Sequence, residues 1–220
     1  MNSDGSNQQN LTKNSAKDED PCFSPEGQRI AFHSNREKTL FQIYAMDMTG
    51  NTLRRRTDIP TDNYGPAWGP GDPTSANPRR LQIAFHQASS GQIWVMYEDG
   101  GNQRPLPNAK GANASWSPDG SRITFWGVKD GKINIFVMNS DGTGLAQVTD
   151  GISIQRDPSW SSDGKRIVFV SNAGGTFDIF SVDAKARLVK LEVEALGATS
   201  DELVRLTDDP GADMHPSCGR

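Results

Sequence analysis

The chain has 220 residues and a hydrophobic fraction of only 34%, with 22 glycines and 13 prolines, a composition typical of many short strands joined by turns. A net charge of −4 and an isoelectric point near 5.4 argue against a broad nucleic-acid surface. No apolar run is long enough to span a membrane, and no signal peptide is visible.

A short motif of an aromatic residue and a turn occurs four times along the chain. The copies are FSPEG at 23–27, WGPGD at 68–72, WSPDG at 116–120 and WSSDG at 160–164. The aromatic positions are separated by 45, 48 and 44 residues. This period is typical of a β-propeller, in which each repeat forms one blade.

Each copy is followed by two β-rich segments at a similar spacing. The first lies at 29–32, 82–85, 122–125 and 166–169, and the second at 43–46, 93–96, 135–138 and 179–182. Their alternating apolar residues, with turn residues between them, predict an all-β chain of four-stranded antiparallel blades. Full blades, numbered 1 to 4, are expected at about 13–57, 58–107, 108–149 and 150–207.

Both ends of the chain match interior parts of the repeat. Residues 1–5 (MNSDG) are identical to residues 138–142, and residues 215–218 align with 157–160. Partial strands are therefore expected at 1–12 and 208–220. Either four blades and these end strands close a ring, or the chain is part of a six- or seven-bladed propeller. We favour the second, in which open blade edges allow the chain to form oligomers.

Two insertions interrupt the regular spacing. One lengthens the first turn of blade 2 at 71–78, and the other adds 14 residues before the last strand of blade 4. Residues 187–194 (RLVKLEVE) in the second insertion suit either an extended hairpin arm or a short helix. Both insertions are expected to project from the blades, and the second is a possible contact for a partner.

Residues 157–172 (DPSWSSDGKRIVFVSN) resemble the TolB-type propeller repeat, and the resemblance covers nearly the whole chain. The MNSDG at 138–142 and the Leu-Thr that ends several blades belong to the same pattern. The family includes TolB, a periplasmic partner of a lipoprotein, as well as propellers of prolyl-oligopeptidase-like peptidases and of some polysaccharide lyases. The resemblance therefore implies a propeller, and a periplasmic or other extracytoplasmic location.

The loops that enter the inner strands ring one mouth of the central channel in a propeller, and they form the candidate binding site. They carry Asp18, Asp20, Asn63, Tyr64, Asn113, Arg156, Asp157 and His215. Carboxylates and amides in such a funnel suit a protein or a basic or polar peptide, or a carbohydrate. Polar loops are also the ordinary state of a protein surface.

A second candidate is a patch between blades. His33 and His86 each follow the phenylalanine of a second strand, and Trp126 has the same position in blade 3. Equivalent positions form an arc around the axis, so these side chains either line a ligand patch or pack between blades. No metal site is predicted, because zinc or manganese needs at least three convergent ligands.

Motifs for catalysis or for a cofactor are absent from the sequence, including a Gly-x-Ser-x-Gly elbow and His-Glu-x-x-His. The basic run 54–56 is expected at a charged outer edge. Cys22 and Cys218 are expected as small buried hydrophobic residues rather than as a disulfide between the first and last blades. The sequence predicts a non-enzymatic binding scaffold; the alternative is the propeller of a peptidase or lyase whose catalytic residues lie elsewhere.

Overall fold

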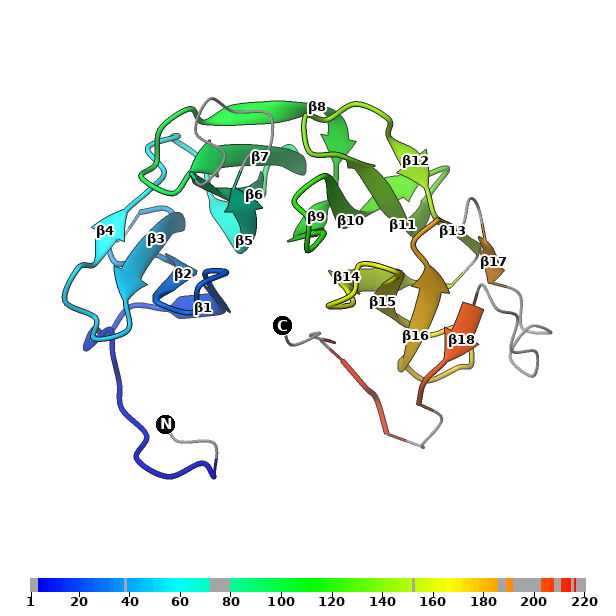
Figure 1. The fold of residues 1–220 in the computed structure, drawn as a ribbon, viewed down its shortest axis with the longest axis horizontal. Helices are drawn as coiled ribbons and strands as arrows, with labels where there is room; N and C mark the ends of the chain where they lie inside the picture. The colour runs from blue at the N-terminus through cyan, green and yellow to red at the C-terminus, as the bar shows by residue number, and fades with distance from the viewer. Residues whose placement is uncertain are drawn as a thin grey trace.

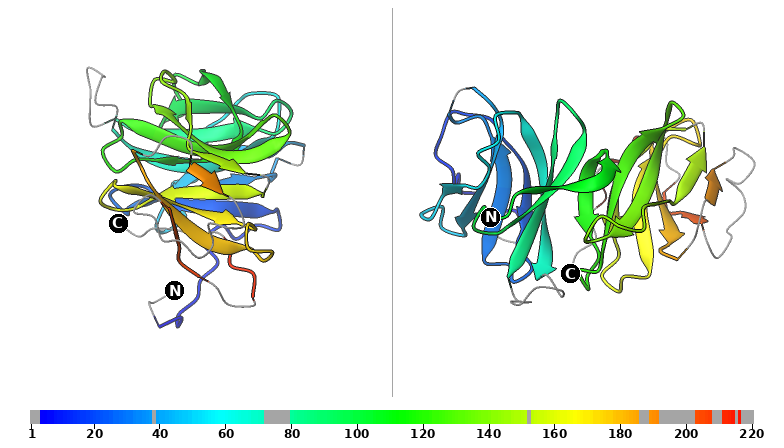
Figure 2. Two further views of the ribbon diagram at one scale, coloured as in Figure 1. Left: turned by 90° about the vertical axis from the view of Figure 1, so that its right-hand side faces the viewer. Right: turned by 90° about the horizontal axis from the view of Figure 1, so that it is seen from above.

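The computed structural model describes residues 4–37, 39–71, 80–151, 153–185, 189–191, 203–207, 211–214 and 216. Within these ranges the strands form four four-stranded sheets and one two-stranded pair. The sheets stand side by side in an arc around a common axis (Figure 1), and Figure 2 shows them from the side and from above. The predicted all-β propeller fold is confirmed. In the same ranges, no helix has the length and apolar character needed to cross a membrane.

Each blade runs outward from the axis in chain order, and all its neighbouring strands are antiparallel. Blade 1 consists of β1 (Asp18–Phe23), β2 (Arg29–Ser34), β3 (Gln42–Asp47) and β4 (Arg54–Arg55). Blade 2 consists of β5 (Asn63–Gly71), β6 (Leu81–Gln87), β7 (Gln92–Tyr97) and β8 (Arg104–Lys110). Blade 3 consists of β9 (Ala112–Trp116), β10 (Arg122–Lys129), β11 (Lys132–Asn139) and β12 (Ala146–Gln147). Blade 4 consists of β14 (Gln155–Trp160), β15 (Arg166–Ser171), β16 (Asp178–Asp183) and β18 (Leu203–Arg205).

A stacked aromatic pair joins the second and third strands at the same position in every blade. The ring centroids are 6.1 Å apart for Phe32 and Tyr44, 6.3 Å for Phe85 and Trp94, 5.7 Å for Phe125 and Phe136, and 6.0 Å for Phe169 and Phe180. In each pair the two residues lie directly opposite each other across the strands. Cross-strand aromatic pairs of this kind stabilise a sheet and fix its register.

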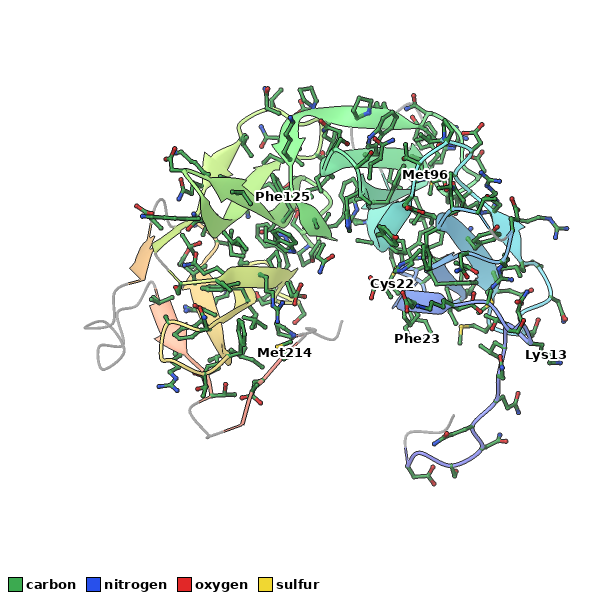
Figure 3. The ribbon with its side chains drawn as sticks, turned by 180° about the vertical axis from the view of Figure 1, so that it is seen from behind. Lys13, Cys22, Phe23, Met96, Phe125 and Met214 are labelled. Atoms are coloured by element: carbon green, nitrogen blue, oxygen red, sulfur yellow. The ribbon has the colours of Figure 1, made fainter. Side chains whose placement is uncertain are left out.

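The aromatic residue of an inner strand packs onto the blade before it. Trp116 in β9 is only 4% exposed, and its Nε1 donates a hydrogen bond to the carbonyl oxygen of Ala67 in β5 at 3.1 Å. A Cβ on Gly69 would lie 2.4 Å from the Trp116 ring, so this close approach requires glycine. Phe23 has the same repeat position in blade 1, where no described blade precedes it, and it is 64% exposed at the inner edge (Figure 3).

Arginines at the start of the second strand also contact the aromatic residue of the following blade. The guanidinium carbon of Arg29 lies 5.2 Å from the ring centroid of Trp68, and that of Arg122 lies 4.5 Å from that of Trp160. These cation–π contacts add to the burial of the rings between blades 1 and 2 and between blades 3 and 4.

The described residues outside the four blades add no further blade strand. Residues 4–17 form turns and extended links, and residues 211–214 and 216 carry no strand. The segments expected to hold partial strands, 1–12 and 208–220, therefore join no sheet where they are described. Both terminal segments lie on the open side of the arc (Figure 1), so the four blades do not close into a ring in this structure.

The insertion in blade 4 is extended where it is described. Val189–Leu191 (β17) pairs in parallel with Thr149–Gly151 (β13), which links blades 3 and 4. These three residues thus form a strand that pairs with the interblade link. The rest of 187–194 and the insertion at 72–78 lie outside the described residues.

We expect Trp116→Ala to lower the free energy of unfolding by about 3–5 kcal/mol, because it removes a buried ring and a hydrogen bond. Phe23→Ala changes the same repeat position at an exposed site, and it should alter the free energy of unfolding by at most about 0.5 kcal/mol. Urea unfolding of both variants measures the difference. Equal losses would show that the packing of this ring onto the preceding blade is not what stabilises the arc.

Candidate functional site

All four inner strands carry a β-bulge at the same repeat position, and the bulge residues line one cavity, which we call the mouth. The register with the second strand shifts there in every blade. The residues with positive φ in the bulges are Asp20 (51°), Gly65 (57°), Asn113 (52°) and Asp157 (54°). The left-handed region admits glycine freely and asparagine and aspartate at low cost, so the backbone itself selects these residue types.

The four bulge residues surround a shallow cavity of about 270 Å³. The rest of its lining consists of Pro21, Cys22, Pro66, Ala114, Ser115, Pro158, Ser159 and Pro216. Proline has a fixed φ and no N–H group, so this lining is stiff and has few backbone donors. Most of the polar chemistry at the mouth therefore comes from the side chains of the bulge residues.

Blades 3 and 4 are linked by polar groups at the mouth. Asn113 Nδ2 donates a hydrogen bond to Asp157 Oδ1 at 2.6 Å. Arg156 Nε lies 3.7 Å from Asp157 Oδ2, and the Arg156 guanidinium lies over the Phe177 ring and contacts the Met214 sulfur at 3.1 Å. Met214 lies on the inner side of the arc (Figure 3). The Asp157 carboxylate is thus held in place and its side chain is only 10% exposed.

On the blade 1 side, two carboxylates lie against a buried imidazole. His33 Nε2 is 3.3 Å from Glu19 Oε2, and His33 Nδ1 is 3.6 Å from Asp20 Oδ2. The Asp20 side chain nevertheless remains 61% exposed. Asp20 is therefore much more accessible to a partner than Asp157.

Asp18 has a structural partner instead. Arg36 donates to Asp18 Oδ1 at 2.8 Å, and both side chains are largely buried. Burial alone would raise the pKa of Asp18, but hydrogen bonds from Ser34, Thr12 and Arg36 outweigh it and lower the pKa below its usual value. This carboxylate anchors the start of β1 and does not line the cavity at the mouth.

Asn63 and Tyr64 lie in the junction between blades 1 and 2 rather than at the mouth. Asn63 is fully buried, and its amide donates to Gln42 Oε1 at 3.2 Å. The Tyr64 ring centroid lies 4.9 Å from that of His33 and 5.1 Å from that of Phe41, and burial raises the pKa of Tyr64. The residue that blade 2 places at the mouth is Gly65. The predicted mouth residue His215 lies outside the described residues.

The predicted patch of His33, His86 and Trp126 is divided between two junctions. Tyr64 separates the histidines, with its ring centroid 6.0 Å from that of His86. His86 and Trp126 instead share a cavity between blades 2 and 3. Burial lowers the pKa of His86 to about 4, with a smaller contribution from nearby His33. In the described ranges, no three His, Cys, Asp or Glu side chains cluster so that they could hold a metal ion.

Cys22 lies at the mouth as a free thiol, and burial raises its pKa to about 12, which makes it unreactive at neutral pH. Cys218 lies outside the described residues. The sequence analysis did not select Gly65, Cys22, Ser115 or Ser159 as mouth residues. A sequence signal for the bulge does exist. The bulge residue lies three positions before the inner aromatic residue of each blade, and a proline follows it in three of the four blades.

Comparison with known proteins agrees with this architecture. Residues 72–200, more than half of the chain, match the family model described as the TolB beta propeller domain. The chain belongs to this TolB β-propeller family. The structure of a putative TolB from Agrobacterium tumefaciens has a TM-score of 0.69 at 22% identity, over 92% of this chain and 66% of that chain.

Two relatives in sequence match shorter segments of this TolB-family chain. The Tol-Pal system protein TolB of Anaeromyxobacter dehalogenans is 34% identical over 125 residues, which are 56% of this chain and 27% of that protein. The uncharacterized peptidase YuxL of Bacillus subtilis is 43% identical over 51 residues, 23% of this chain and 8% of that protein. The chain thus matches well under two thirds of the length of these relatives.

We expect Asn113→Gly to lower the free energy of unfolding by about 1 kcal/mol, because it removes the hydrogen bond to Asp157 but keeps a residue that accepts positive φ. Asn113→Ala should cost about 1 kcal/mol more, since alanine is strained in this region. Thermal and urea unfolding of both variants test this order. If the alanine variant were more stable than the glycine variant, the positive φ of the bulge would not determine which residue type is favoured there.

The low pKa of His86 predicts a stability change in mild acid. The unfolded chain takes up this proton below about pH 6.5 whereas the folded chain takes it up only near pH 4, so stability falls as the pH drops through this window. Between pH 7 and pH 4.5 the loss should be about 2 kcal/mol. His86→Gln should show a loss smaller by that amount, measured by urea unfolding at both pH values. If the stability of the wild-type protein and of His86→Gln depends on pH in the same way, the pKa of His86 is not lowered in the folded state.

Proposed function

We propose that this chain is a non-enzymatic TolB-type propeller unit that binds a protein or peptide partner at the channel mouth. The observation that carries the proposal is the set of bulge side chains held by the backbone around a proline-rich floor. Asp20 is open to solvent, and the Asn113–Asp157 pair presents a fixed polar edge opposite it. A preorganised surface of this kind loses little conformational entropy when it binds.

The chemistry of the mouth favours a basic peptide segment over a carbohydrate. Asp20 and Asp157 line this cavity and supply carboxylates that attract lysine and arginine side chains, and Glu19 directly precedes Asp20. Sugar rings are commonly bound against aromatic faces, and the described residues that line this cavity include no aromatic ring. The TolB relative is named as a Tol-Pal system protein, and we extend from it to this chain both protein binding and an extracytoplasmic location.

A second candidate is the propeller of a peptidase, and the identity with a segment of YuxL supports it. In that case the mouth would admit peptides to a catalytic domain beyond these residues. Both candidates require the mouth to bind peptide, but only a peptidase would cleave the peptide. Mass spectrometry of the peptide after incubation with the longest protein that the gene encodes separates the two: intact peptide supports the scaffold, and cleaved peptide supports the peptidase.

The test uses a fluorescein-labelled peptide of alternating lysine and serine, with binding followed by fluorescence anisotropy. We expect the double variant Asp20→Asn/Asp157→Asn to bind at least about fivefold more weakly, because two charges are lost. Asparagine already occupies this position in blade 3, so both changes fit the bulge conformation.

Asp130→Asn is the matched control, because Asp130 is exposed and also has positive φ (52°) but lies in the β10–β11 turn outside the cavity. It should leave the affinity unchanged. If the wild-type chain does not bind the peptide, or if the double variant and the control bind it equally well, the basic-peptide proposal for the mouth fails.

A further inference from the structure

A cavity of about 560 Å³ lies between blades 2 and 3, beside the channel mouth. Its walls include Tyr64, His86, Gly91, Lys110, Ala112 and Trp126. Most of the exposed lining is apolar, and the volume is within the range of small-molecule sites. It shares no lining residue with the cavity at the mouth.

The repeat explains why this junction is hollow. In the junction between blades 1 and 2, the Tyr64 ring packs against His33 and Phe41. The residue of blade 3 at the position of Tyr64 is Ala112, since Tyr64 pairs with His86 and Ala112 pairs with Trp126 at the same register. One junction is therefore filled by a ring that the next junction lacks.

A second ring is missing from the same place. Phe41 directly precedes Gln42 at the start of β3, and the residue that precedes Gln92 at the start of β7 is Gly91. The junction between blades 2 and 3 thus keeps the histidine but has alanine and glycine in place of tyrosine and phenylalanine. The space left is that of aromatic rings, so its shape suits a planar aromatic group.

Charge at the rim indicates which aromatic group fits. Lys110 is exposed at the edge of the cavity. It lies two residues before Ala112, and the residue two positions before Tyr64, at the equivalent position of the preceding repeat, is Asp62. The described residues that line the cavity include no aspartate or glutamate, and no salt bridge to Lys110 is found within the described part of the chain. A ligand that carries a carboxylate next to its ring would complement this cation.

Two aromatic side chains form part of the walls. They are those of His86 and Trp126, from neighbouring second strands. The neutral imidazole and the indole ring also provide aromatic surfaces for a ligand ring.

We propose that this cavity binds a small aromatic carboxylate, whose ring takes the place that Tyr64 fills one junction earlier and whose carboxylate pairs with Lys110. The proposal is independent of peptide binding at the mouth. The site exists because this junction has Ala112 and Gly91 at the positions that Tyr64 and Phe41 occupy in the preceding junction.

The probe is indole-3-acetate, titrated into isotope-labelled protein while the indole N–H signal of Trp126 is followed by NMR. We expect a saturable shift of this signal, assigned with Trp126→Phe, at concentrations below about 5 mM. Indole-3-ethanol, which lacks the charge, should bind about threefold more weakly. No saturable shift with indole-3-acetate would overturn the proposal.

Variants locate the site and test the charge. Lys110→Gln should weaken indole-3-acetate about threefold and leave indole-3-ethanol unchanged, whereas Lys165→Gln, at an exposed lysine in a turn of blade 4, should affect neither. If Lys110→Gln weakens the two ligands equally, the assigned carboxylate contact is wrong.

Ala112→Tyr restores the side chain that the repeat uses in blade 2 and should abolish binding without lowering the melting temperature. Ala88→Trp, at an exposed lining residue, blocks the cavity without touching the core and serves if Ala112→Tyr fails to fold. Binding that survives both blocking variants places the ligand elsewhere and overturns the proposal.

The mouth variant Asp20→Asn is a control and should leave the binding of indole-3-acetate unchanged.

Discussion

The arc depends on the burial of the inner tryptophans of blades 2, 3 and 4 against the blade before each of them. Trp116 shows this contact in full, with its ring over Gly69 and its indole N–H on the Ala67 carbonyl. Hydrophobic burial provides the main driving force, and the hydrogen bond fixes the rotation of the ring. Burial of the ring recurs at Trp68 and Trp160, whereas the indole hydrogen bond is found only at Trp116 among these three tryptophans, so stability is close to a sum of unequal contacts between neighbouring blades. The exposed ring of Phe23 marks the side of blade 1 that no described blade covers.

Rigid junctions allow the surface chemistry to differ from blade to blade. The inner strands keep their bulges and register whether the side chain at the bulge is a carboxylate, an amide or a hydrogen atom. The adjacent position varies even more, from Tyr64 through Ala112 to Arg156, and so fills, empties or charges successive junctions. A repeated backbone with unequal side chains thus places a polar mouth and an apolar cavity next to each other.

The fold could be predicted from the sequence because its signals are local and repeated. Turn residues, alternating strands and an aromatic period of 44 to 48 residues predict the blades without any knowledge of contacts. The candidate site is harder to predict from the sequence than the fold. Asn63 and Asp157 both enter inner strands and both are polar, yet one is buried against Gln42 and the other faces the mouth. Which way a side chain points depends on the bulge, a shift of one residue that hydrophobic patterning does not reveal. The cavity between blades 2 and 3 depends on which side chains occupy equivalent positions in two junctions, and no single motif reveals it.

The left-handed bulge also limits how this mouth can change during evolution. Aspartate and asparagine have nearly the same shape, and glycine simply removes the side chain, so replacements among the three leave the backbone where it is. Any other residue type would strain the strand at the point where it lines the channel. The net charge of the mouth can therefore drift in single steps while its diameter stays constant. The surface chemistry of such a propeller can therefore change by point substitutions that leave the fold of its inner strands intact.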